Sequence, residues 1–194
     1  MLLVTAGEAG GFAIPGVAWF AGWQLDFAPI ALAALVVAGG AGEGFVLGTS
    51  QRHALAHATD PGRSWVAATA AAAAFAWVLG MAPNTAYDLG APARTAVALG
   101  VAGAPFILIS IGVAQAMVLR RFVRRARRWV WVNIGAWLAA LPVSFIGPAL
   151  VPNGSAAWVF GVAWVVSGVV MAAILAAVTG WGMRKLLAGA TAPG

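Results

Sequence analysis

Six apolar stretches occupy most of this 194-residue chain and leave only short polar connections between them. An α-helix rises about 1.5 Å per residue, so about 20 apolar residues cross the roughly 30 Å hydrocarbon core of a bilayer. Only helices and closed barrels satisfy every backbone polar group in lipid, and these stretches lack the alternation of barrel strands. The sequence therefore predicts an all-α integral membrane bundle, one transmembrane domain over residues 1–194, with spans at 2–23, 28–50, 65–83, 95–119, 129–150 and 157–181.

The composition excludes several classes of protein. Hydrophobic residues make up 62% of the chain and charged residues 8%, which leaves too little polar surface for a water-soluble globule. The absence of cysteine excludes disulfides and thiolate ligands. The first apolar stretch has no preceding basic residues and contains Glu8, so we interpret it as the first span rather than as a signal peptide.

Basic residues lie mainly on one side of the predicted bundle. Cytoplasmic loops collect Lys and Arg, which places the loop between spans four and five in the cytoplasm. Arg52 and Arg63 follow span two, Arg184 and Lys185 follow span six, and only Arg94 lies on the other side. We therefore expect a bacterial inner-membrane protein with both termini cytoplasmic. Membrane ends account for the net charge of +6, so we expect no nucleic-acid partner. Six arginines of one loop are expected to contact anionic lipid headgroups: Arg120, Arg121, Arg124, Arg125, Arg127 and Arg128.

An internal repeat relates the three pairs of spans. Gln51, Gln115 and Thr179 are spaced by 64 residues, and Trp65 and Trp129 open spans three and five with the same spacing. Equivalent spans run in the same direction, so the repeat predicts three parallel helical hairpins around an axis along the membrane normal.

The repeat also predicts a polar layer near the cytoplasmic ends of the spans. Interhelical hydrogen bonds in such a layer are each worth about 0.6 to 2 kcal/mol. We favour a structural layer that holds the helices together over the alternative, a polar pathway. Its expected members are Thr5, Gln51, Thr69, Gln115, Asn133 and Thr179. Gly40, Gly44 and Gly48 lie one turn apart on span two and predict a close approach of another helix.

Two local signals predict how spans two and three begin. Asp26 is placed to cap the second helix, with Pro29 in its first turn. The segment from Thr59 to Gly62 stops that helix, and Ser64 is placed to cap the third.

Glu8 and Glu43 are the acidic residues that lie well inside spans. Each is expected about 10 Å deep on facing helices of the first hairpin. Two facing carboxylates would hold a shared proton or a cation. The alternative is that each is protonated and bonded to a neighbouring helix, or reaches the interface.

His53, His57 and Asp60 have a spacing that would align them on one helix face. Two imidazoles and a carboxylate would suit a metal ion. The second copy of the repeat has Met117 and Arg121 at the histidine positions, so we favour a headgroup-facing stretch. Trp77, Trp137 and Trp164 lie deeper, where packing is favoured over a groove for a pigment, quinone or lipid.

Two motifs carry a family resemblance: Gly48-x-x-Gln51-x-x-x-Leu55 and Gly112-x-x-Gln115-x-x-x-Leu119. Each is followed by a tryptophan that opens the next span. The chain resembles small multi-pass membrane proteins of high-GC bacteria, a group that implies this topology and no particular activity. Its helix number is also similar to that of the vitamin-binding S components of energy-coupling transporters, whose substrate-site motifs it lacks.

No catalytic triad, phosphate-binding glycine loop or histidine ladder is present, so we expect no enzyme activity, and the sequence indicates no cofactor. The first expectation is an accessory or assembly subunit of a membrane complex, with a membrane-protein partner or a second copy of itself. The alternative is a small transporter or substrate-binding membrane subunit that uses Glu8 and Glu43.

Overall fold

The computed structural model describes residues 2–56 and 59–191, and these form helices joined by short loops without any strand. All six helices are long and apolar enough to cross a membrane, which fits a membrane protein and confirms the predicted all-α, six-span class. The helices are α1 (Leu2–Gln24), α2 (Pro29–Leu55), α3 (Gly62–Asp88), α4 (Ala93–Leu119), α5 (Arg128–Ala149) and α6 (Ala157–Thr191).

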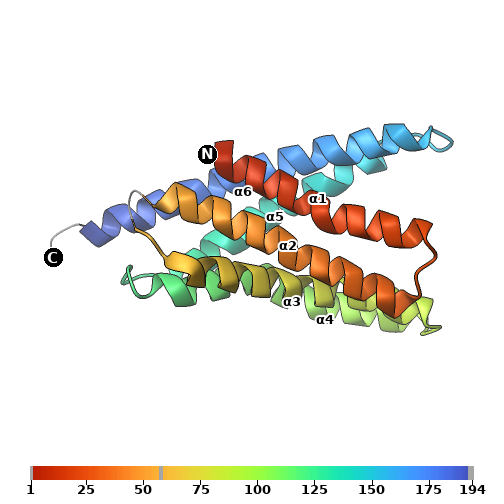
Figure 1. Cartoon of the computed structure of the whole chain (residues 1–194), viewed down its shortest axis with the longest axis horizontal. Helices are drawn as coiled ribbons and strands as arrows, with labels where there is room; N and C mark the ends of the chain where they lie inside the picture. The colour runs from red at the N-terminus through yellow and green to blue at the C-terminus, as the bar shows by residue number, and fades with distance from the viewer. Residues whose placement is uncertain (1, 57–58, 192–194) are drawn as a thin grey trace.

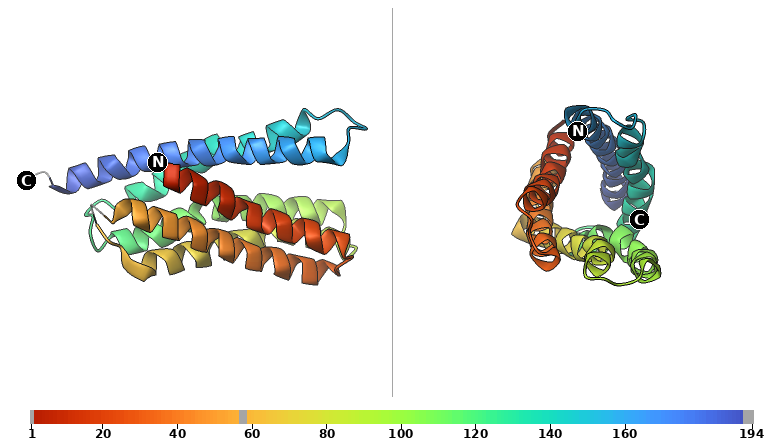
Figure 2. Two further views of the ribbon diagram at one scale, coloured as in Figure 1. Left: turned by 45° about the horizontal axis from the view of Figure 1, so that its top comes forward. Right: turned by 90° about the vertical axis from the view of Figure 1, so that its right-hand side faces the viewer.

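The six helices form a closed ring. Each packs against its neighbours in chain order, and α1 also packs against α6, as the end-on view in Figure 2 shows. The loops that join α1 to α2, α3 to α4 and α5 to α6 lie at one end of the bundle (Figure 1). The other end, here called the basic end, carries the start of α1, the end of α2, the start of α3, the arginine-rich α4–α5 loop and the end of α6.

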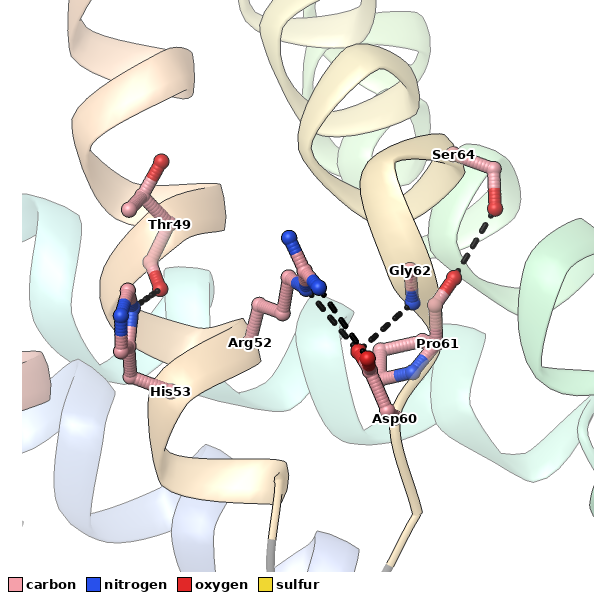
Figure 3. Close-up of polar contacts among 7 residues, drawn as sticks. All are labelled: Thr49, Arg52, His53, Asp60, Pro61, Gly62 and Ser64. Carbon is pink, nitrogen blue, oxygen red and sulfur yellow. Dashed lines mark hydrogen bonds and ion pairs between the residues drawn. The ribbon is translucent and has the colours of Figure 1, made fainter.

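Both predicted helix caps are wrong. Asp26 lies in the α1–α2 loop with a φ of 51°, and α2 begins at Pro29 after Ala28 without a side-chain cap. α3 begins at Gly62, two residues before Ser64, because Asp60 accepts a hydrogen bond from the Gly62 N–H at 2.9 Å and closes a tight turn there. The Ser64 hydroxyl instead donates to the Pro61 carbonyl (Figure 3).

The glycines of α2 let this helix approach its neighbour closely, as predicted. A Cβ atom on Gly44 would lie 2.7 Å from the Ala70 Cα atom, and one on Gly48 would lie 3.0 Å from the Val66 Cα atom. Gly40 faces the Trp77 ring in the same way. Only a helix without side chains at these points can pack backbone to backbone with α3.

Replacing Gly44 with alanine should therefore force α2 and α3 apart. We expect Gly44→Ala to lower the free energy of unfolding by about 1 to 3 kcal/mol, measured by denaturant titration in mixed micelles. Gly10→Ala is the matched control, because a Cβ atom on this exposed glycine meets nothing within 4 Å. Equal stabilities for the two variants would contradict the close packing.

Candidate functional site

A single buried amide joins four helices near the basic end. Gln115 on α4 is 0% exposed. Its Nε2 atom donates to Gln51 Oε1 on α2 at 2.7 Å and to Thr69 Oγ1 on α3 at 2.9 Å. Its Oε1 atom accepts from Trp129 Nε1 on α5 at 2.8 Å. The side chain of Gln115 is thus bonded to three neighbouring helices at once.

Tryptophan and glutamine pair in the same way at two places in the ring. Trp65 Nε1 donates to Gln51 Oε1 at 3.2 Å, and Trp129 Nε1 donates to Gln115 Oε1, and the partners are 14 positions apart in both cases. The sequence placed both tryptophans at equivalent positions of the repeat but predicted no hydrogen bond for either. The equal spacing of glutamine and tryptophan in the two copies was the signal that could have revealed it.

The other predicted members of the polar layer are mostly buried, and where they donate hydrogen bonds they donate to their own helices. Thr69 Oγ1 donates to the Trp65 carbonyl at 2.8 Å, and Asn133 Nδ2 donates to the Trp129 carbonyl at 3.1 Å. Thr179 Oγ1 donates to the Leu175 carbonyl at 2.6 Å. Thr5 is half-buried and takes no part in the network formed by the described residues.

Glu8 and Glu43 face the interior of the first hairpin. Glu8 is 1% exposed, and neither of its carboxylate oxygens has a hydrogen-bond partner among the described residues. Glu43 is 5% exposed and accepts a hydrogen bond from Trp77 Nε1 at 2.6 Å. Gly11, one turn after Glu8, packs against the backbone and side chain of Glu43. The structure thus brings together the two glutamates that the sequence singled out.

A cavity of about 230 Å³ lies beside Glu43. Its walls are largely apolar and include Phe12, Trp77 and Trp137, and Glu43 is its one ionisable lining residue. Trp164 instead stacks on Phe12, with the ring centroids 5.7 Å apart. Of the three deep tryptophans, Trp77 and Trp137 therefore border the Glu43 cavity, whereas Trp164 packs against an aromatic neighbour.

The candidate metal ligands have other contacts. Asp60 forms an ion pair with Arg52, in which Nε lies 2.9 Å from Oδ1 and Nη2 lies 3.0 Å from Oδ2 (Figure 3). The hydrogen bonds from Arg52, followed by that from the Gly62 N–H, lower the pKa of Asp60 to about 2. His53 Nδ1 lies 2.8 Å from the Thr49 carbonyl oxygen, and His57 lies outside the described residues. Within the described part of the chain, no group of three His, Cys, Asp or Glu side chains could hold a metal ion.

The arginine-rich loop is anchored by small apolar residues. Val123 and Ala126 are buried in a core cluster with Trp65, Trp129 and Leu119. The six arginines of the segment are all exposed, and none forms an ion pair with a described residue. The loop therefore presents its positive charge at the basic end of the bundle.

Comparison of the chain with models of protein families, with curated proteins and with solved structures finds no match. Two features stand out in the interior of the ring: a network of hydrogen-bonded amides and indoles around Gln115, and a pair of buried carboxylates beside a cavity.

Removing the Gln115 amide should destabilise the ring. Gln115→Leu leaves the Trp129 indole N–H buried without its acceptor, so we expect the free energy of unfolding in mixed micelles to fall by about 1 to 3 kcal/mol. Ser110→Ala on the same helix removes a hydroxyl that bonds only within α4, and should cost less than about 1 kcal/mol. A loss in Gln115→Leu no larger than that in Ser110→Ala would contradict the role of this amide.

Proposed function

We propose that this chain binds protons or small cations inside the helix ring and moves them across a membrane, with Glu8 and Glu43 as the binding groups. The observation that carries the proposal is the Glu8 carboxylate, which is buried without a hydrogen-bond partner in the described part of the chain. A buried, unpaired carboxylate ion costs several kcal/mol, so a proton or a cation must neutralise it. Ionisable groups that are retained at such a cost inside membranes mark ion and proton pathways.

Glu43 supplies the second half of the proposed site. It comes from the facing helix, packs against Gly11 one turn after Glu8 and borders a cavity. Among the described residues its carboxylate accepts one hydrogen bond, from Trp77 to a single oxygen, so the other oxygen is available to a bound proton or cation. A site of this kind needs no catalytic group.

The packing of α2 favours this transport function over the accessory-subunit function. A small-residue face on a membrane helix attracts a partner only where it is exposed. Here Gly44 and Gly48 pack against α3, and Gly40 is covered by Trp77. An accessory or assembly subunit, bound to another membrane protein or to a second copy, remains the other candidate, and the exposed apolar side chains around the ring are compatible with it.

We further propose that the chain lies in a bacterial inner membrane with both termini and the basic end in the cytoplasm. The basic end holds every Lys and Arg except Arg94, in the α4–α5 loop and in the parts of α2, α3, α5 and α6 that reach this end, as the positive-inside rule requires. The six exposed arginines of the α4–α5 loop then lie at the depth of lipid headgroups, where anionic lipids would neutralise them.

We also propose that the ring consists of three parallel hairpin repeats. The repeated Trp-to-Gln hydrogen bond supports this, as does the direct bond between Gln115 and Gln51, which lie 64 residues apart. The common placement of the three hairpin loops at one end of the bundle is consistent with it (Figure 1).

Dicyclohexylcarbodiimide tests the carboxylate site because it reacts with protonated carboxyl groups in apolar surroundings. We expect mass spectrometry of the purified protein to find the adduct on Glu8 or Glu43 and not on the exposed Asp88. In proteoliposomes that contain a pH-sensitive dye, an imposed Na⁺ or K⁺ gradient should drive proton movement through the wild type. Glu8→Gln and Glu43→Gln should abolish it.

The glutamine variants separate function from folding. Glu43→Gln keeps an oxygen that accepts the Trp77 hydrogen bond, so the helix contact is preserved while the ionisable group is lost. Asp88→Asn is the control for removal of an acidic residue outside the ring interior. Full proton movement in Glu43→Gln would eliminate the proposal, and a stable co-purifying membrane protein would favour the accessory function instead.

A further inference from the structure

A second and larger cavity lies at the basic end, away from the glutamates. Its volume is about 330 Å³, within the usual range of ligand sites, which begins at about 300 Å³. The two indoles that donate hydrogen bonds to glutamines, those of Trp65 and Trp129, line this cavity. Gln51, Thr179, Gly180 and Arg184 also line it. It therefore combines aromatic walls, neutral hydrogen-bonding groups and one positive charge.

The cavity lies where the glutamine and tryptophan pairing is absent. At two places in the ring, a glutamine side-chain oxygen accepts a hydrogen bond from a tryptophan indole, and the paired side chains fill the space there. On α6 the corresponding residue is Thr179, a shorter side chain whose hydroxyl turns back to the Leu175 carbonyl of its own helix. α1 has no tryptophan before Trp19, so it supplies no indole at this end. A Cβ atom on the adjacent Gly180 would meet nothing within 4 Å, which shows how open the wall is.

Two of the polar groups that line the cavity are available to a ligand. Gln51 Oε1 already accepts hydrogen bonds from Gln115 and Trp65, and among the described residues its Nε2 donor has no acceptor. Arg184 is exposed and forms no ion pair with a described residue. Asp60, the acidic residue of this end, is already paired with Arg52.

We propose that this cavity binds one amphiphilic anion. The carboxylate or phosphate of the ligand lies on the Arg184 guanidinium, and its apolar body lies against Trp65 and Trp129. Gln51 Nε2 donates to an oxygen of the ligand. A fatty acid and a single-chain anionic phospholipid share this chemistry. The proposal does not depend on the carboxylate site, because Glu8 and Glu43 do not line this cavity.

Native mass spectrometry and calorimetry in a neutral detergent test the proposal with four probes. These are oleate, oleoyl lysophosphatidylglycerol, oleoyl lysophosphatidylcholine and inorganic phosphate. We expect one equivalent of oleate or of the lysophosphatidylglycerol to bind to the wild type. The zwitterionic lipid lacks the net charge, and phosphate lacks the apolar body, so neither should bind measurably. Oleate alone would identify a carboxylate ligand, and lysophosphatidylglycerol alone a phosphate ligand.

Neighbouring basic residues give a matched pair of variants. Arg184→Gln should weaken binding of the anion about tenfold, or about 1.4 kcal/mol. Lys185→Gln removes the same charge from the adjacent position, but the Lys185 ammonium lies 4.0 Å from the centroid of the Trp181 ring and does not line the cavity. It should change the affinity by less than about twofold. Equal losses of affinity in the two variants would show that Arg184 acts only through the general surface charge, and this would overturn the proposal.

Filling the cavity gives an independent test. Gly180→Leu places a side chain in open space inside a helix, so it should abolish binding without lowering the melting temperature. Retention of the anion in Gly180→Leu would place the ligand elsewhere. Arg184 is exposed, so the comparison of Arg184→Gln with Lys185→Gln decides the question even if Gly180→Leu does not fold. Failure of both oleate and the lysophosphatidylglycerol to bind to the wild type would also refute the site.

Discussion

The ring of helices depends on the hydrogen bonds made by one buried amide, that of Gln115. Lipid tails are as apolar as leucine, so the hydrophobic effect does little to hold membrane-spanning helices together, and close packing and interhelical hydrogen bonds must do so. Gln115 on α4 reaches Gln51, Thr69 and Trp129, and thereby joins α2, α3 and α5. Backbone contact at Gly44 and Gly48 tightens the same region. The two helices outside this network, α1 and α6, complete the ring by packing against each other.

The proposed binding sites lie where buried polar groups no longer have all their hydrogen-bond partners. Around Gln115 each buried indole donor and each amide oxygen has a partner, which is how structural polar groups behave. Glu8 on α1 has none among the described residues, and Thr179 on α6 leaves a cavity where glutamine and tryptophan fill the other two places. Both sites involve α1, which supplies Glu8 to the carboxylate site and Val4 to the basic-end cavity. The proposed repeat would account both for what holds the bundle together and for where the bundle is open.

Hydropathy predicted the number and order of the helices but underestimated the length of several of them, above all α2, α3 and α6. α2 continues to Leu55 and α6 to Thr191, because polar residues such as Gln51 and Arg52 extend a helix beyond its apolar stretch. α3 likewise begins at Gly62, where Asp60 closes the turn before it. Such turns depend on local backbone geometry, which the capping signal at Ser64 did not reveal.

The candidate site was predictable in part. The shared depth of Glu8 and Glu43, and of Gln51 and Gln115, follows from position along the spans. The bond between Glu43 and Trp77 was not predictable, because it depends on how α2 and α3 are rotated toward each other. The roles of Trp65 and Trp129 were hidden by the usual preference of tryptophan for the membrane interface. Neither cavity could be anticipated, since cavities are set by the packing of side chains from several helices.

A double-mutant cycle between Gln115 and Trp129 tests most directly whether interior hydrogen bonds hold the ring. Gln115→Leu, Trp129→Phe and the double variant would be unfolded under identical micelle conditions. If the bond between Trp129 Nε1 and Gln115 Oε1 stabilises the fold, the two losses are not additive, and the coupling energy is about 0.6 to 1.7 kcal/mol. Additive losses, with a coupling energy near zero, would contradict the central place given to Gln115.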